Sequence, residues 1–66
     1  MRITVNGEQT DMPDDVTLLA CLELRGLNPA TVVVERNRDI VPADTFADVR
    51  LAPGDTLEIL HFVGGG

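Results

Sequence analysis

Length, composition and charge exclude several classes of protein. A chain of 66 residues with a formal net charge of −6 has room for one small domain and repels nucleic acid, whose phosphates carry the same sign. The single cysteine, Cys21, and the single histidine, His61, exclude an internal disulfide and a Cys/His metal site. No stretch reaches the ~20 apolar residues of a membrane span and no signal peptide is visible, so we expect a cytoplasmic protein that does not bind a membrane.

The first segment, residues 2–12, predicts a β-hairpin. Ile3 and Val5 alternate with polar residues and therefore share one face of a strand. Asn6-Gly7 favours a type I′ turn, because both central positions of that turn need a positive φ. With this two-residue loop, Val5 is expected to pair with Glu8.

The next segment predicts a helix over residues 18–25. Thr17 is a suitable N-cap and Gly26 stands where a C′ glycine would follow the last turn. Four residues follow the spacing of a buried helical stripe, namely Leu18, Cys21, Leu22 and Arg25. Because Cys21 lies on this stripe, we interpret it as a small buried hydrophobe and not as a nucleophile.

The remaining residues predict short elements separated by turn residues. In chain order they are a valine-rich central strand at Thr31–Arg36, a turn at Asn37–Asp39, a return strand at Ile40–Val41, one helical turn at Ala43–Ala47 with Phe46 pointing inward, a short strand at Val49–Leu51, a turn at Pro53–Asp55 and a last strand at Thr56–Val63. In the last strand Leu57 and Ile59 face one side, whereas Leu60 and Phe62 face the other.

This order of elements predicts an α+β fold. A helix that follows a hairpin can cover one face of a mixed sheet in which the first and last strands lie side by side, which is the β-grasp roll with one main helix. We expect the domain to span residues 1–63 and residues 64–66 to form a flexible glycine tail. Glycine lacks Cβ, so such a tail can enter a narrow channel and present an unhindered terminal carboxylate. The motif alone leaves a frayed terminus or a cloning scar open as alternatives.

Three stretches are distinctive when taken together: Val34–Asn37, Ile40–Val41 and, most specifically, Gly54–Gly66 with its terminal His-Phe-Val-Gly-Gly-Gly. With these stretches, the first hairpin and the helix that Thr17 leads, nearly the whole chain resembles the ThiS family, the sulfur carriers of thiamine biosynthesis. It implies a ubiquitin-like β-grasp fold and a carrier that is not itself an enzyme. The family needs two terminal glycines and this chain has three, so Gly64 is expected mainly to lengthen the stalk.

The resemblance also implies partners and a modified residue. A ThiF-type adenylating enzyme would use ATP to convert the carboxylate of Gly66 to an acyl-adenylate. A sulfur donor such as a cysteine desulfurase would replace AMP and leave a thiocarboxylate, whose sulfur thiazole synthase (ThiG) would take. The chain would bind no cofactor or metal and have no catalytic residue; Val63, Gly64 and Gly65 would form the partner-binding tail.

Leu60 and Phe62 are expected to form an exposed apolar patch beside the tail, unless a neighbouring loop covers them. We assign no catalytic role to His61. Three alternatives remain open at this stage: a related Gly-Gly carrier for molybdopterin, cysteine or tRNA thiolation, a ubiquitin-like protein modifier, and an interaction module with an idle tail. An enzyme is least favoured, because the sequence lacks a paired nucleophile and base and a phosphate-binding glycine loop before a helix.

Overall fold

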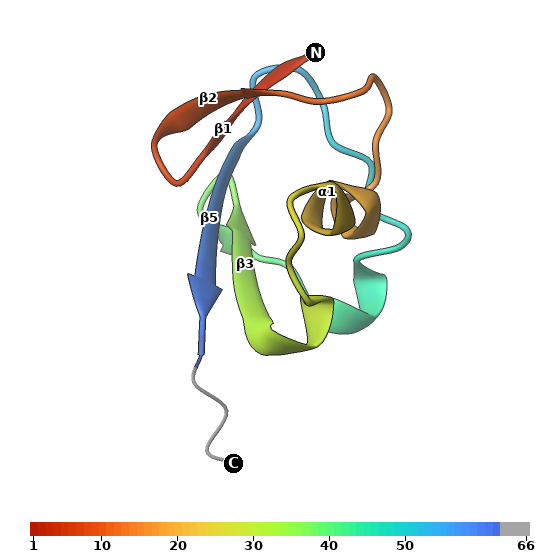
Figure 1. Cartoon of the computed structure of the whole chain (residues 1–66), viewed down its shortest axis with the longest axis vertical. Coiled ribbons are helices and arrows are strands. Elements are labelled where there is room, and N and C mark those ends of the chain that lie inside the picture. The colour runs from red at the N-terminus through yellow and green to blue at the C-terminus, as the bar shows by residue number, and fades with distance from the viewer. Residues whose placement is uncertain (63–66) are drawn as a thin grey trace.

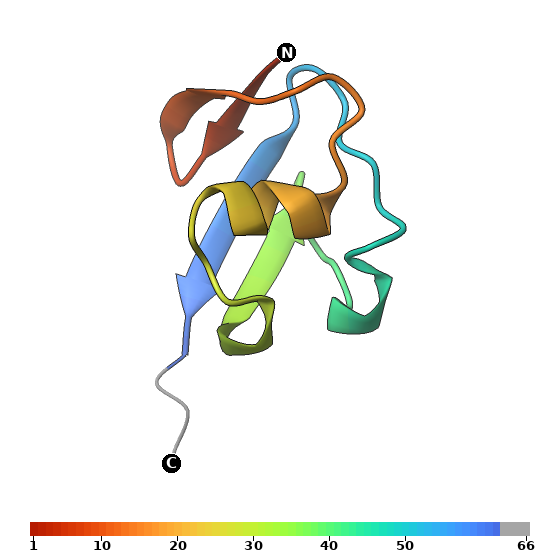
Figure 2. The same ribbon diagram turned by 45° about the vertical axis from the view of Figure 1, so that its right-hand side comes forward.

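The computed structural model describes residues 1–62, which form a sheet with one α-helix on one face (Figures 1 and 2). The strands are β1 (Arg2–Val5), β2 (Glu8–Asp11), β3 (Val32–Arg36), β4 (Asp39–Ile40) and β5 (Thr56–His61). The α-helix is α1 (Leu18–Leu24), and the 3-10 turns are η1 (Pro29–Thr31) and η2 (Ala43–Thr45). The predicted two-layer α+β arrangement is confirmed.

The five-stranded sheet has the order β2-β1-β5-β3-β4. β5 runs parallel to β1 and antiparallel to β3, so the first and last strands lie side by side as predicted. β3 was predicted to be central; it is an interior strand between β5 and β4, but β5 occupies the middle of the sheet. The last strand is therefore the middle strand of the sheet, paired with β1 on one side and with β3 on the other.

The first hairpin has the predicted turn and register. Asn6 and Gly7 have φ values of 49° and 83°, as a type I′ turn requires. Val5 lies opposite Glu8, and Ile3 lies opposite Thr10. The positive φ at both loop positions explains why this hairpin could be placed from the Asn-Gly pair.

Both ends of α1 are closed by the predicted caps. The Thr17 hydroxyl oxygen accepts a hydrogen bond from the Ala20 N–H at 3.1 Å. At the other end the Gly26 N–H donates to the Glu23 carbonyl and the Leu27 N–H donates to the Leu22 carbonyl, both at 2.9 Å. This pair of bonds, with Gly26 at φ 72°, is a Schellman motif and satisfies carbonyls that the helix leaves free.

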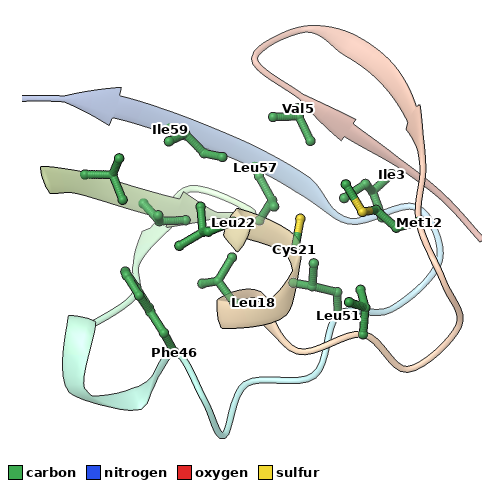
Figure 3. Packing of buried hydrophobic residues seen from close by; sticks show 13 residues of the cluster. Ile3, Val5, Met12, Leu18, Cys21, Leu22, Phe46, Leu51, Leu57 and Ile59 are labelled. Atoms are coloured by element: carbon green, nitrogen blue, oxygen red, sulfur yellow. The ribbon is translucent and has the colours of Figure 1, made fainter. Parts of the chain in front are cut away.

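The core lies between the inner face of the sheet and α1 (Figure 3). Leu18, Cys21 and Leu22 are completely buried on the helix, whereas Arg25, at the C-cap, is exposed. The long connection between β4 and β5 closes the remaining side of the core with Phe46 and Leu51, and the inward position of Phe46 was predicted. Burying such aliphatic and aromatic side chains provides about 1.5–3 kcal/mol each, which is the main stabilisation available to so small a domain.

One predicted strand is absent, and the bounds of three others were wrong: β3 begins at Val32 and not at Thr31, β4 spans Asp39–Ile40 and not Ile40–Val41, and the last strand is shorter than predicted. Residues 49–51 form no strand: Arg50 makes an isolated bridge to Thr17, with bonds from the Leu18 N–H to the Val49 carbonyl and from the Leu51 N–H to the Val16 carbonyl. The ladder cannot continue because its partner segment turns into α1 at Leu18. The last strand ends at His61, and Val63 lies outside the described residues.

The turn before β5 agrees with its sequence. Gly54 has a φ of 84°, and the Asp55 N–H donates to the Ala52 carbonyl at 3.1 Å. Pro53 fixes the preceding φ, as expected for the first central position of a type II turn. Within residues 1–62, no helix has the length and apolar character needed to cross a membrane.

Candidate functional site

The candidate site is the C-terminal end of β5, from which the chain continues into the glycine segment. Here Leu60 lies opposite Val33, and His61 lies opposite Val32. The Phe62 N–H donates to the Thr31 carbonyl at 3.2 Å, one residue beyond the end of the strand. The backbone is therefore paired with β3 as far as His61 and hydrogen-bonded to the end of η1 at Phe62.

Leu60 and Phe62 form the apolar surface predicted at this site. Their exposed fractions are 58% and 49%, whereas Leu57 and Ile59 on the other face are at most 5% exposed. The strand alternation explains the difference, since successive side chains point to opposite faces. The alternative that a loop covers the pair is wrong. Partner binding by Leu60 and Phe62 stays a prediction.

An asparagine from the first hairpin holds β5 from the other side. The Asn6 side chain donates from Nδ2 to the Ile59 carbonyl at 3.2 Å and accepts from the Ile59 N–H at Oδ1 at 2.7 Å. A side-chain amide has the same donor and acceptor as a peptide group, so it continues the parallel pairing after β1 has turned away. The sequence does not predict this role, because the two residues are 53 positions apart.

The start of β5 is held by a buried carboxylate, Asp55, which the sequence analysis treated only as a turn residue. Its Oδ2 accepts from the Arg36 Nε at 2.9 Å and from the Ala52 N–H at 2.8 Å, and its Oδ1 accepts from the Asn37 Nδ2 at 3.1 Å. Burial by itself raises the pKa of the Asp55 carboxyl. The bonds from Ala52, Asn37 and Arg36, together with the guanidinium charge, outweigh burial and hold that pKa below its usual value.

Cys21 is unsuited to nucleophilic chemistry. Burial raises the pKa of its thiol, an effect that the charge of nearby Arg25 only partly offsets, so the thiolate is disfavoured. His61 is exposed on β5, whereas Cys21 is completely buried on α1. Within residues 1–62 no group of His, Cys, Asp and Glu is arranged to hold a metal ion.

Four predicted site residues lie outside the described part of the chain: Val63, Gly64, Gly65 and Gly66. Conversely, the structure adds residues that the sequence analysis did not assign to the site. Val33 pairs with Leu60, and Ile40 on β4 is 65% exposed. The register of β3 against β5 and β4 places Val33 and Ile40 on the face that bears Leu60. Alternation within a single strand does not show which residues of neighbouring strands share a face, so the sequence did not predict this.

The sheet is mixed and five-stranded, its first and last strands run parallel in the interior, and one helix covers one face. This arrangement defines a β-grasp protein of the ubiquitin-like class. The crystal structure of the thiamine biosynthesis protein ThiS from Geobacter metallireducens matches this chain with a TM-score of 0.84 and 29% identity over 100% of both chains. Residues 2–66 match the model of the ThiS family, and the chain belongs to that family.

Relatives of known name agree with this assignment. The sulfur carrier protein ThiS of Bacillus subtilis is 35% identical over 65 residues, which cover 97% of this chain and 98% of that protein. A thiazole synthase of Paramagnetospirillum magneticum is 41% identical over 66 residues, and one of Magnetococcus marinus is 39% identical. The chain spans only 20% of the length of each of these two thiazole synthases.

Proposed function

We propose that this chain is a cytoplasmic sulfur carrier of thiamine biosynthesis, with the α-carboxylate of Gly66 as the group that is modified. The chain is a substrate and donor in this proposal and not an enzyme. The observation that carries it is the family match over residues 2–66, which includes the glycine segment. The end of β5 supports it, because strand pairing and a backbone hydrogen bond hold the last described residues up to Phe62.

The chemistry of the terminal carboxylate requires activation before sulfur can be added to it. A carboxylate is a poor acyl donor, so one of its oxygens attacks the α-phosphorus of ATP on a ThiF-type enzyme, releasing pyrophosphate and forming an acyl-adenylate. A persulfide sulfur, supplied by a donor such as a cysteine desulfurase, then displaces AMP. A thiolate then attacks the donor-side sulfur of the resulting S–S bond, forming a disulfide with the donor and releasing the thiocarboxylate. Its sulfur is a nucleophile that can enter the thiazole ring on thiazole synthase.

Thiazole synthase is the proposed acceptor of the sulfur. Two proteins of that name contain a segment similar to the whole of this chain within a longer polypeptide. Such an arrangement keeps a carrier and its acceptor at equal amounts and high local concentration. It favours the thiazole pathway over molybdopterin, cysteine or tRNA thiolation, which the fold by itself does not distinguish.

The exposed pair Leu60 and Phe62 is proposed as the apolar part of the docking surface for these enzymes. Exposed apolar residues that flank a functional segment are typical of interaction sites. Both side chains are about half exposed, so replacing either with alanine should reduce binding with little loss of stability.

The direct test is intact mass spectrometry of the chain after incubation with ATP, the adenylating enzyme and a persulfide donor. The untreated mass first establishes that Gly66 is the last residue. We then expect the mass increase of an oxygen-to-sulfur exchange, located at Gly66 by fragmentation. A variant that lacks Gly65 and Gly66 serves as the control and should gain nothing. Absence of the adenylate and of the sulfur shift, with an enzyme that modifies the Bacillus subtilis protein, would contradict the proposal.

A genetic test separates thiamine biosynthesis from related pathways. Deletion of the gene should cause thiamine auxotrophy while molybdoenzyme activity stays intact. Complementation by the wild-type chain, but not by the chain without its last two glycines, would assign the phenotype to the tail. The opposite pattern of phenotypes would redirect the carrier to another pathway. Covalent adducts on target lysines would instead support a protein modifier.

A further inference from the structure

The outer face of the sheet, opposite α1, consists of two chemically different halves. On the β1–β2 half the polar side chains bond to one another: Arg2 Nε lies 3.1 Å from Asp11 Oδ1, and Gln9 Nε2 donates to Thr4 Oγ1 at 3.2 Å. This half needs no external partner, because its charges and amides are already paired.

On the other half, formed by β3, β4 and β5, two glutamates lie directly opposite each other. The register pairs Glu35 with Glu58, and on an antiparallel sheet such neighbours have Cβ atoms about 5 Å apart. No hydrogen bond or salt bridge within residues 1–62 involves either carboxylate. Like charges in this position destabilise a sheet, so folding alone gives no reason for the pair.

Apolar side chains flank the two glutamates on the same face. On one side the register places Leu60 against Val33, and on the other side Ile40 lies opposite Glu35. Leu60 is 58% exposed and Ile40 is 65% exposed. We call this set, Val33, Glu35, Ile40, Glu58 and Leu60, the acidic-apolar face.

We propose that the acidic-apolar face binds a protein partner through an arginine that lies between Glu35 and Glu58. A planar guanidinium has five N–H donors and can bond to two carboxylates at once, which replaces their repulsion with two charge-assisted pairs. Apolar side chains around that arginine would cover Leu60 and Ile40 and exclude water, which strengthens the charged contacts. The net charge of −6 would also speed the approach of a basic surface.

Other ligands fit the acidic-apolar face less well. Two carboxylates supply fewer oxygens than the roughly six to eight that a calcium ion takes, and residues 1–62 contain no group of three or more His, Cys, Asp or Glu residues suited to a metal. Nucleic acid is repelled by the same charges. A basic protein surface matches both the charge and the exposed apolar area. This inference rests on the proposed function, because that proposal supplies the two partners, the adenylating enzyme and thiazole synthase.

The test measures the affinity of the intact chain for each of the two purified enzymes by titration calorimetry. Glu58→Gln and Glu35→Gln should each weaken binding to at least one enzyme about tenfold. Glu23→Gln, which removes the same charge from the exposed side of α1, is the matched control and should change binding less than twofold. For the apolar part, Ile40→Ser should weaken binding, whereas Leu24→Ser, at a residue 62% exposed on α1, should not.

Thermal unfolding of the same variants distinguishes this role from a structural one. If the pair exists for binding, Glu58→Gln should leave Tm unchanged or raise it, because a like-charge repulsion is removed. Weaker binding at an unchanged or higher Tm supports the inference. Wild-type affinity in Glu35→Gln and Glu58→Gln, or an equal loss in Glu23→Gln, overturns it.

Failures of the two proposals are distinguishable. If the wild-type chain binds and gains sulfur but both glutamine variants bind equally well, only this inference fails. If the chain binds through the two glutamates but no sulfur is added at Gly66, only the sulfur-carrier proposal fails. If the wild-type chain binds neither enzyme, this inference is overturned.

Discussion

The two hairpin turns of this small domain use the same device on opposite sides of β5. Asn6-Gly7 joins β1 to β2, and Asn37-Arg38 joins β3 to β4; all four residues have positive φ. Asn6 bonds through its side chain to the backbone of Ile59, and Asn37 bonds to that of Thr56, with the Thr56 N–H donating to Oδ1 at 2.9 Å. Each turn therefore ends its own hairpin and also anchors the middle strand.

The two turns differ in what surrounds the asparagine. The side-chain hydrogen bonds of Asn6 within residues 1–62 go to Ile59 of β5, whereas Asn37 also donates to the buried carboxylate of Asp55, which in turn binds Arg36. The second loop position is glycine in the first turn and Arg38, at φ 75°, in the second. The first turn thus has a glycine, which adopts a positive φ without strain, at its second position. The second combines an unfavourable residue at a positive φ with a charged network that holds it in place.

The largest expected effect comes from removing the network of the second turn. Asp55→Ala deprives Arg36, Asn37 and the Ala52 N–H of a common acceptor, and we expect a loss of about 3 kcal/mol in the free energy of unfolding. For a domain of this size that loss lowers Tm by roughly 15 °C. Thermal and urea unfolding followed by circular dichroism would measure it.

Asp48→Ala is the matched control, because Asp48 is an exposed acid in the same connection. It should change stability by less than about 0.5 kcal/mol. Equal losses in the two variants would show that the Asp55 network does not support the second turn.

The next effect concerns the amide of the first turn. Asn6→Ala removes both bonds to Ile59, leaves the N–H and carbonyl of that buried residue without their partner, and places alanine at a φ of 49°. We expect a loss of about 2 kcal/mol. Asn6→Gly also removes the amide but tolerates the positive φ, so it should lose about 1 kcal/mol. If both variants lose the same amount, the backbone conformation contributes nothing. If neither Asn6 variant loses stability, the hydrogen bonds between the Asn6 side chain and Ile59 do not stabilise β5.

Acid should weaken the second turn and spare the first. The folded-state pKa of Asp55 lies below its unfolded value, so the ionised carboxylate stabilises the fold at all pH values above the usual carboxyl range. That contribution falls as the pH is lowered through and below about 4, where the unfolded chain binds the proton first. Urea unfolding from pH 6 to pH 2.5 should show a shallower loss of stability in Asp55→Asn than in the wild type. A slope in Asp55→Asn parallel to that of the wild type would contradict the assignment.

Local signals predicted the elements of this fold well. The Asn-Gly turn, the Thr17 cap, the Gly26 C′ position and the alternation in β5 each depend on residues a few positions apart, so the sequence contains all their determinants. The exposure of Leu60 and Phe62 follows from the same alternation. In contrast, Asp55 meets Asn37 and Arg36 across 18 and 19 residues, and Asn6 meets Ile59 across 53. These contacts depend on the strand order, which no local pattern specifies.

The candidate site divides in the same way. Gly66, the residue proposed to be modified, was predicted through resemblance to a family and lies outside the described residues. The face built from Glu35 and Glu58 became visible only when β3 and β5 were in register. The prediction of a strand at Val49–Leu51 failed for the complementary reason: the residues alternate properly, but their partner segment becomes a helix.

The smallest expected effect compares the second positions of the two turns. Arg38→Gly should stabilise the chain by about 0.5 kcal/mol, because relief of a positive φ exceeds the entropy that glycine adds to the unfolded state. The mirror variant is Gly7→Ala. A Cβ at Gly7 would meet nothing within 4 Å, so its expected loss of about 1 kcal/mol reports backbone strain alone. Urea unfolding at neutral pH measures both changes, provided that the free energy of unfolding depends equally steeply on urea concentration in each variant and in the wild type. If Arg38→Gly is destabilised, the Arg38 side chain stabilises the second turn by more than its positive φ destabilises it. The residue at the second position would then stabilise this turn through its side chain, whereas in the first turn Gly7 acts through its backbone alone.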